Sequence, residues 1–323
     1  MADNKRYMTP TVVGRFAPSP TGRMHLGNIY TALISWLAAK SAGGRWILRI
    51  EDLDPQRSRT EYARLIEDDL HWLGLEWDEG GLDDRGPHGP YSQSGRTHLY
   101  EAALAQLRES GLTYPCRCTR ADLNASSAPH ASDGRRIYPG TCRPAAVPPF
   151  AAVADTDTDL RATTRLYVPD RPVEFTDAVF GPQTVNLARE CGDFVLRRAD
   201  GAWAYQLAVV VDDADMEVNQ IVRGADLLAS AAQQNYLRQI IGLPPVRYAH
   251  LPLICNADGR RLSKRDPDLD MAHLRRDRSP QQIIGLAARL AGLNPAGLSA
   301  RPSDLLADFS FTRIPSVPTV TIS

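Results

Sequence analysis

Two short segments, one near each end of the chain, contain residue types that can hold phosphate groups. Residues 18–28 read PSPTGRMHLGN, in which a proline- and glycine-containing turn leads through His25 and Gly27 into a helical pattern. A turn between a strand and a helix presents backbone N–H groups and the positive end of the helix, and phosphate binds well there. His25 could donate a hydrogen bond to phosphate oxygens as charge develops at phosphorus. The alternative is that His25 only caps or packs against the helix.

The second segment, residues 261–265, reads RLSKR and lies in a region rich in glycine, arginine and serine. The chain has 37 basic residues, of which only Lys5, Lys40 and Lys264 are lysines, so arginine fills a basic position about nine times in ten. A compact ammonium group suits a phosphate that moves during a reaction. Lys264 is therefore the second candidate for phosphate binding.

The elements around these segments predict an α/β fold. Strand patterns at residues 11–16 and 46–50 alternate with helical patterns at 28–42, 59–73 and 96–110, which favours a parallel sheet. Further strands are predicted at residues 194–197, 204–211 and 217–222, and further helices at 227–241 and 281–291. We expect a Rossmann-type, doubly wound parallel sheet.

Prolines, short strand-like runs and a cysteine cluster interrupt this alternation and predict an inserted subdomain. The strand-like runs are residues 161–168 and 173–179. The expected organisation is a first half of the nucleotide-binding domain (8–114), a zinc-containing insertion (115–190), a second half with the 261–265 loop (191–265), and a short helical C-terminal region (266–323). The tail after Ile314, which is rich in proline, serine and threonine, is expected to be loose.

Three of the five cysteines, Cys116, Cys118 and Cys142, lie close together in the sequence and suggest one structural zinc ion per chain. A closed tetrahedral site needs a fourth ligand. The nearby candidates are Asp122, His130, Asp133 and Tyr138, and general zinc chemistry favours His130. The alternative is three thiols in a small core.

The charge and the apolar runs of the chain limit its partners and its location. The net charge is −1, so a nucleic-acid partner would have to be met by a local basic patch. No apolar run has the length of a signal peptide or a membrane span, so we expect a cytoplasmic protein without a membrane partner.

Taken together, the two segments resemble the signature motifs of class I aminoacyl-tRNA synthetases. HLGN at 25–28 resembles the HIGH motif, and RLSKR at 261–265 resembles the KMSKS loop. The strings GRFAPSPTG (14–22), RIEDLDP (49–55) and VRGAD (222–226) are similar to the glutamyl branch, so the resemblance spans about residues 14–265. Two positions depart from the motifs, since Arg261 replaces the first lysine and Asn28 the final histidine.

The resemblance implies ATP-dependent activation of glutamate, in which glutamyl-adenylate forms without an enzyme nucleophile and magnesium enters with ATP. It assigns catalysis to His25, Asn28 and Lys264. The implied ATP-binding residues are Pro18, His25, Gly27, Asn28, Asp226, Ser263 and Lys264. Asp226 could contact the ribose or cap the following helix.

Glutamate binding needs guanidinium groups for carboxylates and a carboxylate for the ammonium group. By resemblance, the residues at these positions are Arg15, Ser19, Glu51, Tyr205 and Arg223. Arg15 and Arg223 are assigned to the carboxylates, in an order that the sequence leaves open, and Glu51 to the ammonium group. Ser19 and Tyr205 would orient the substrate. The resemblance also implies Tyr138 as the fourth zinc ligand, because the family shows a Cys-x-Cys, then Tyr-x-x-x-Cys arrangement.

About 60 residues follow Lys264, too few for another large domain. This short C-terminal part resembles a group within the glutamyl branch that lacks the anticodon-binding domain. In that group glutamate passes to the queuosine base in the anticodon loop of tRNA(Asp), which makes the anticodon stem-loop the expected partner of a monomeric enzyme. The alternatives are a truncated synthetase that charges the tRNA 3′ end, and an inactive, zinc-containing RNA-binding paralogue. Intact His25, Glu51 and Lys264 argue against inactivity.

Overall fold

The structure, a computed structural model, describes residues 11–119, 121–122, 137–146, 148–149, 162–256, 260 and 269–322. The predicted loop at 261–265, with Ser263 and Lys264, lies outside the described residues, as do His130 and Asp133. Among the helices of the described part, none is long and apolar enough to cross a membrane.

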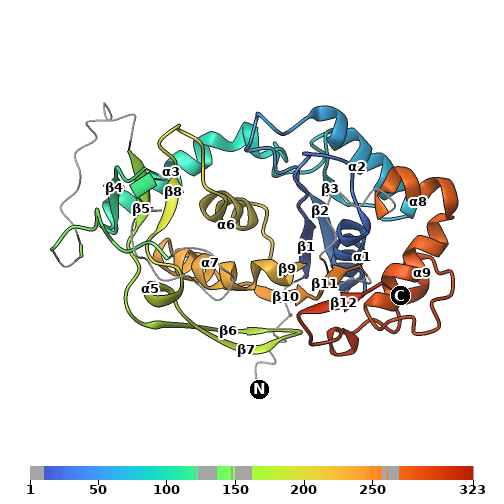
Figure 1. The fold of residues 1–323 in the computed structure, drawn as a ribbon. Coiled ribbons are helices and arrows are strands. Elements are labelled where there is room, and N and C mark those ends of the chain that lie inside the picture. The colour runs from blue at the N-terminus through green and yellow to red at the C-terminus, as the bar shows by residue number, and fades with distance from the viewer. Residues whose placement is uncertain are drawn as a thin grey trace, which may run out of the picture.

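A seven-stranded sheet forms the centre of the molecule (Figure 1). In spatial order its strands are β3 (Glu79–Gly80), β2 (Arg45–Leu48), β1 (Val13–Phe16), β9 (Gln220–Gly224), β10 (Arg247–Leu251), β6 (Pro172–Asp177) and β7 (Gly181–Asn186). Neighbouring strands are parallel from β3 to β6, and β7 runs antiparallel to β6. The predicted parallel α/β fold is confirmed.

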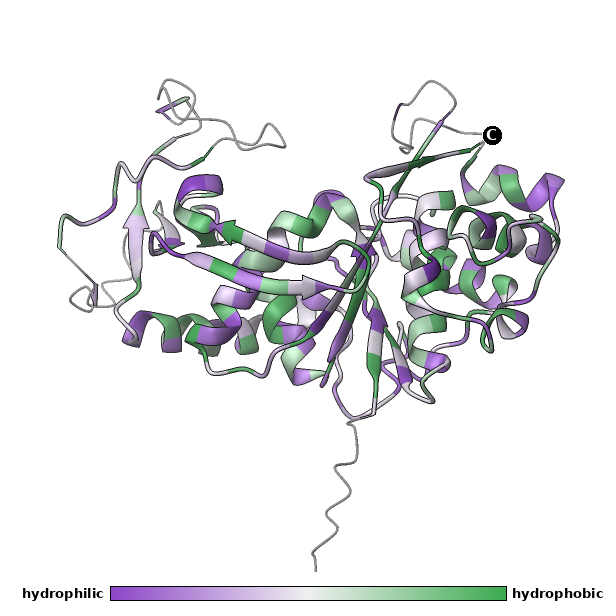
Figure 2. Cartoon of the chain, turned by 90° about the horizontal axis from the view of Figure 1, so that it is seen from below, coloured by the Kyte–Doolittle hydropathy of each residue, from purple (hydrophilic) through white to green (hydrophobic). Residues whose placement is uncertain are grey.

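Helices cover both faces of this sheet (Figure 1). The helices on the side of α1 (Leu26–Lys40), which packs on the strands, are α2 (Thr60–Leu73), α8 (Met271–Asp277) and α9 (Pro280–Leu290), of which α9 packs against α1 and α2. The helices on the other side are α6 (Tyr205–Asp215), α7 (Leu228–Ile240) and α3 (Thr97–Glu109), which packs against α6. Alternate strand residues serve the two faces, because Phe16 and Trp46 pack in the core with α1 whereas Val13 and Ile47 pack on the opposite side. In Figure 2 the strands at the centre show hydrophobic residues (green) interrupted by hydrophilic ones (purple).

A separate antiparallel sheet consists of β4 (Thr113–Cys116), β5 (Thr163–Leu166) and β8 (Phe194–Arg197). The stretch predicted as an insertion therefore supplies strands to both sheets, since β5 lies here whereas β6 and β7 extend the large sheet. The short helix α5 (Leu187–Glu190) lies between β7 and β8. Short 3-10 helices complete the described chain: η1 (Gln93–Arg96), η2 (Ala225–Leu227), η4 (Pro302–Leu305) and η5 (Phe311–Arg313).

The prediction of a strand at residues 204–211 is wrong, because these residues begin helix α6. The run Val209–Val210–Val211 favours a strand locally, but α6 is buried along most of its length, including Asp212 and Asp213. A helix that is buried nearly all round gives an apolar run without clear periodicity, and periodicity alone cannot distinguish such a run from a buried strand.

The expectation of a loose tail after Ile314 is also wrong. Residues Thr319–Thr321 form β12, which pairs in parallel with β11 (Leu253–Cys255). Val320 packs against the main core, and β-branched threonines flank it. The C-terminal segment is therefore tied to a strand that follows directly on β10.

Candidate active site

One cavity of about 490 Å³ opens where β1, β9 and β10 end and helix α1 begins. This edge of a parallel sheet is where ligands of α/β proteins bind. All the predicted glutamate- and ATP-binding residues within the described part of the chain line the cavity: Arg15, Pro18, Ser19, His25, Gly27, Asn28, Glu51, Tyr205, Arg223 and Asp226. The structure thus brings together residues that are up to about 200 positions apart in the sequence.

His25 is both the cap of α1 and a wall of the cavity. Its Nδ1 accepts the Gly27 N–H at 3.0 Å, and its own N–H donates to Asn28 Oδ1 at 3.0 Å. Because Nδ1 accepts, a neutral ring carries its proton on Nε2. A Cβ at Gly27 would lie 2.8 Å from His25 Cε1, so only glycine lets the ring lie this close to the helix start. The cap therefore fixes the orientation of the imidazole.

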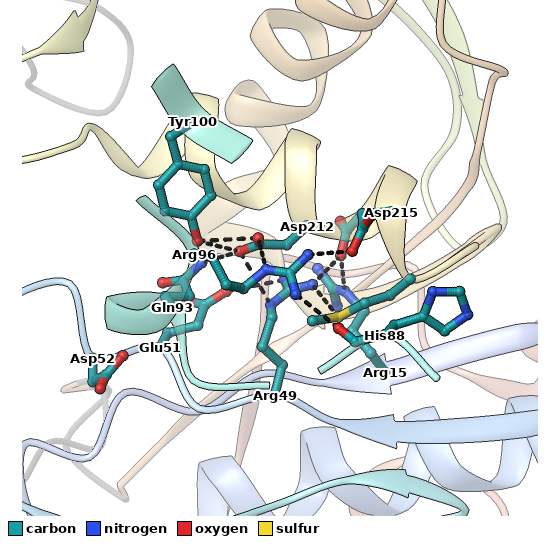
Figure 3. Close-up of polar contacts among 12 residues, drawn as sticks. Arg15, Arg49, Glu51, Asp52, His88, Gln93, Arg96, Tyr100, Asp212 and Asp215 are labelled. Carbon is teal, nitrogen blue, oxygen red and sulfur yellow. Dashed lines mark hydrogen bonds and ion pairs between the residues drawn. The ribbon is translucent and has the colours of Figure 1, made fainter. Parts of the chain in front are cut away.

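A buried ionic network lies behind Arg15 and Glu51 (Figure 3). The carboxylate of Asp213 accepts from Arg15 Nε at 3.2 Å and from Arg49 Nη1 at 2.7 Å. Arg49 in turn donates from Nη2 to Glu51 Oε1 at 3.2 Å. Arg49 is 0% and Asp213 1% exposed. Asp213, on α6, therefore holds Arg15 of β1 directly and, through Arg49, holds Glu51, which follows β2.

Burial and charge act together on these groups. Burial raises the pKa of Glu51, although Arg49 and Arg15 oppose the shift. Burial also acts to raise the pKa of Asp213, but Arg15 and Arg49 outweigh it, so this pKa is lowered. The pKa of Tyr205 is raised by burial and by the negative charge of Glu51. Tyr205 therefore keeps its hydroxyl proton at neutral pH.

The neighbouring Asp212 anchors α6 to a second part of the chain. It accepts hydrogen bonds from Arg96 Nε at 2.6 Å, Gln93 Nε2 at 2.7 Å and the Tyr100 hydroxyl at 2.9 Å. Arg49, Asp212 and Asp213 are not among the site residues predicted from the sequence. The signal was present, because charged residues inside apolar runs are costly to bury unless they are paired.

Arg223, at the end of β9, is held on three sides. Its Nε donates to His250 Nε2 at 3.0 Å, its Nη1 to Gln234 Oε1 at 2.8 Å, and its Nη2 to the Leu227 carbonyl at 3.3 Å. The side chain is 4% exposed and lines the cavity. Its partners come from β10, α7 and η2, so the direction of the guanidinium group is set by three elements.

Asp226 lies in the cavity wall within η2. Gly224 and Leu227 occupy the cap positions of η2 and α7, and neither makes a side-chain cap hydrogen bond. Both roles of Asp226, the ribose contact and the helix cap, stay predictions. A Cβ at Gly224 would lie 2.6 Å from Asp226 Oδ1, so a larger residue at position 224 would require the Asp226 side chain to move.

The three predicted zinc cysteines meet beside the small sheet. The sulfur atoms of Cys116, Cys118 and Cys142 all lie within 4.8 Å of one another, and Cys118 Sγ is 3.5 Å from Cys142 Sγ. The Tyr138 hydroxyl lies 3.4 Å from Cys116 Sγ. Burial acts to raise the pKa of Cys116, but hydrogen bonds with Tyr138 and Arg165 outweigh it and lower this pKa to about 7. Three clustered thiols suit zinc, and this cluster could hold a metal ion.

Among the fourth-ligand candidates in the described residues, Tyr138 lies in the cluster whereas Asp122 is engaged elsewhere. The Asp122 carboxylate accepts the N–H and the hydroxyl of Thr119 at 2.7 and 2.8 Å.

Comparison with known proteins gives a consistent result. The family described as tRNA synthetases class I (E and Q), catalytic domain, matches residues 11–302. The chain is 48% identical to a protein of Symbiobacterium thermophilum named glutamyl-Q tRNA(Asp) synthetase, covering 94% of each chain. It is 46% identical to the protein of the same name from Nitratidesulfovibrio vulgaris, covering 95% of each. Its fold is similar to that of a glutamate tRNA ligase from Elizabethkingia meningosepticum, solved with its amino acid, with a TM-score of 0.80 and 27% identity over 97% of this chain and 67% of that chain.

Proposed function

The chain belongs to the catalytic-domain family of the class I tRNA synthetases of the E and Q type, and from this membership we propose that it activates L-glutamate with ATP and transfers it to tRNA(Asp). The observation that carries this function is the single cavity in which two arginines, one glutamate and a phosphate-binding helix start meet. The proposed acceptor is the queuosine base of the anticodon loop.

Glutamate is complementary to the charges on one side of the cavity. Arg15 and Arg223 would bind its two carboxylates, which favour guanidinium partners. The ammonium group would bind Glu51, whose burial makes a cationic partner favourable. Ser19 and Tyr205 would orient the amino acid by hydrogen bonds, and Asp213 keeps Arg15 and Arg49 in place behind them.

ATP would bind at the start of α1, with its phosphates near His25, Gly27 and Asn28. Pro18 belongs to the same turn, Asp226 would contact the ribose, and Ser263 and Lys264 would contact the phosphates. Magnesium enters with ATP. The α-carboxylate of glutamate attacks the α-phosphorus, the bond to the β,γ-phosphates breaks, and pyrophosphate leaves. His25 Nε2–H and the Lys264 ammonium group stabilise the negative charge that develops.

In the second step a hydroxyl of queuosine attacks the carbonyl carbon of glutamyl-adenylate, and AMP leaves. Identity of 46–48% to proteins named glutamyl-Q tRNA(Asp) synthetase, against 27% to the glutamate tRNA ligase, supports this acceptor over the tRNA 3′ end. Because single-stranded loops expose base edges, the anticodon loop is suited to recognition by a protein pocket. We propose that the enzyme is a monomer and that it acts in the cytoplasm.

A structural zinc ion would be held by Cys116, Cys118, Cys142 and the Tyr138 hydroxyl. The purified protein is expected to contain one zinc per chain, and Cys142→Ser is expected to remove most of it, because three thiolates would become two. Elemental analysis with a thermal melt measures both the content and the loss of stability. Cys191→Ser, outside the cluster, should retain the metal. A zinc-free wild type would contradict the proposal.

Glutamate-dependent exchange of pyrophosphate into ATP tests the activation step. Lys264→Ala should lower the exchange rate by about tenfold or more, because a charge at the phosphates is lost, while circular dichroism stays unchanged. Lys40→Ala is a matched control, since Lys40 forms an ion pair with Asp78 away from the cavity. Unchanged exchange in Lys264→Ala would show that residues 261–265 have another role.

A further inference from the structure

We propose that Asp177 and His250 are positioning residues that hold Arg223 in the orientation for binding glutamate, an inference that rests on the proposed function. Neither residue lines the cavity. The three side chains form a buried line across neighbouring strands, from the end of β6 through β10 to β9. Their exposed fractions are 2% for Asp177, 0% for His250 and 4% for Arg223.

The direction of each hydrogen bond in this line is determined by chemistry. A guanidinium N–H can only donate, so His250 Nε2 must accept from Arg223 Nε, 3.0 Å away. A neutral imidazole then carries its proton on Nδ1, which donates to Asp177 Oδ2 at 2.7 Å. Asp177 therefore selects the tautomer of His250 that can accept from Arg223.

Asp177 is itself held firmly. Its Oδ1 accepts the N–H groups of Val179 and Phe180 at 2.9 and 3.0 Å, and its Oδ2 also accepts the N–H of His250 at 3.0 Å. The carboxylate cannot turn away from the imidazole without leaving these N–H groups without their acceptor. The turn after β6 therefore fixes Asp177, and Asp177 in turn fixes His250 on β10.

The surroundings of His250 favour its neutral form. Among the described residues, Asp177 and Arg223 are hydrogen-bonded to its ring, and the Tyr248 ring stacks on the imidazole with centroids 5.8 Å apart. Burial lowers the pKa of His250, and the charge of Arg223 adds to this shift. Together they outweigh the opposing effects of Asp177 and of a hydrogen bond with the Leu227 backbone. A neutral ring is the form that can accept from Arg223.

Holding Nε fixes the plane of the guanidinium group. Gln234 holds Nη1 and the Leu227 carbonyl holds Nη2, so His250 supplies the third point that determines how the fork is aimed. Bidentate recognition of a carboxylate depends on this aim. If His250 carried its proton on Nε2, two N–H donors, those of His250 Nε2 and Arg223 Nε, would face each other. The guanidinium group would then turn away from the direction needed for the glutamate carboxylate.

Asp177→Asn is the sharpest variant, because it keeps size and one acceptor oxygen but presents an NH₂ group to His250. The ring would then accept at Nδ1 and carry its proton on Nε2. We expect the KM for glutamate in pyrophosphate exchange to rise by about tenfold or more, while the KM for ATP stays within about twofold. The control is Asp170→Asn, which alters an exposed partner of Arg189 outside the cavity. An unchanged KM for glutamate, or an equal rise in both KM values, would overturn the proposal.

His250→Gln supplies a second arm. A glutamine amide oxygen can accept from Arg223 whether position 177 carries a carboxylate or an amide. Adding Asp177→Asn to this variant should therefore change the KM for glutamate by less than about threefold, so the two effects should be strongly non-additive. Additive effects would overturn the proposed path through the imidazole.

A measurement that does not need activity separates this inference from the proposed function. Nitrogen-15 NMR of histidine side chains, with His250→Gln to assign the signal, should show wild-type His250 protonated on Nδ1 and unprotonated on Nε2. A proton on Nε2 would overturn the positioning role. A wild-type enzyme without glutamate-dependent exchange would instead overturn the proposed function, and the NMR spectrum would still decide the tautomer.

Discussion

Replacing Arg223 by glutamine is expected to raise the KM for glutamate by about 30- to 1,000-fold, which corresponds to a loss of about 2 to 4 kcal/mol when a carboxylate loses its charge-assisted partner. Arg223 is buried at the cavity wall and its orientation is fixed by three partners, so no other cation can easily take its place. The KM for ATP should be unaffected. Pyrophosphate exchange at varied glutamate concentration measures the effect.

Arg15→Gln should have a comparable effect, and comparing the two variants identifies their separate roles. If the replaced arginine binds the side-chain carboxylate, the variant enzyme should also lose discrimination against glutamine. If it binds the α-carboxylate, that discrimination should be kept. Arg247→Gln is the matched control, since Arg247 is an exposed arginine on β10 outside the cavity. A normal KM for glutamate in both Arg15→Gln and Arg223→Gln would contradict the proposed pocket.

Replacing His25 by asparagine is expected to lower kcat for adenylate formation by about 100- to 1,000-fold, the range seen when one donor to a developing negative charge is removed. Asparagine is a good helix cap, so the start of α1 should survive and the free energy of unfolding should change by less than about 0.5 kcal/mol. The variant therefore separates the imidazole from the cap. Single-turnover adenylate formation and a denaturant melt measure the two quantities.

His98→Asn, on the exposed side of α3, controls for loss of a histidine and should keep full activity. If His25→Asn retained wild-type kcat, the role of His25 would be only to cap α1. If the variant lost stability along with activity, the ring would be needed for folding, and the catalytic assignment would lose its support.

Local patterns were sufficient for the elements that build the phosphate-binding edge. The strand at residues 11–16, the turn and the helix at 28–42 correspond to β1 and α1, because a buried strand, a glycine turn and a capped helix each leave a local signature. Helix α6 was predicted as a strand because its burial depends on α3, α7 and the sheet, and local periodicity contains none of that information.

Local sequence patterns likewise predict the residues of the cavity wall but not the residues that support them. Most residues that would touch substrate lie in recognisable motifs, Tyr205 being the exception, whereas Asp177, Asp213 and His250 act through contacts made across the fold. Asp177 meets His250 only because β6, from the stretch interpreted as an insertion, lies next to β10. Strand order is a property of the whole chain, so no local pattern could place this pair.

The acceptor of the activated glutamate is tested most directly by locating labelled glutamate on RNA. The enzyme is incubated with ATP, labelled glutamate and either tRNA(Asp) with queuosine, tRNA(Asp) without it, or tRNA(Glu), and the label is mapped by nuclease digestion. The proposed function predicts label only on the queuosine-containing tRNA(Asp), within an anticodon-loop fragment. Label at the 3′ end of tRNA(Glu), with none on tRNA(Asp), would contradict it.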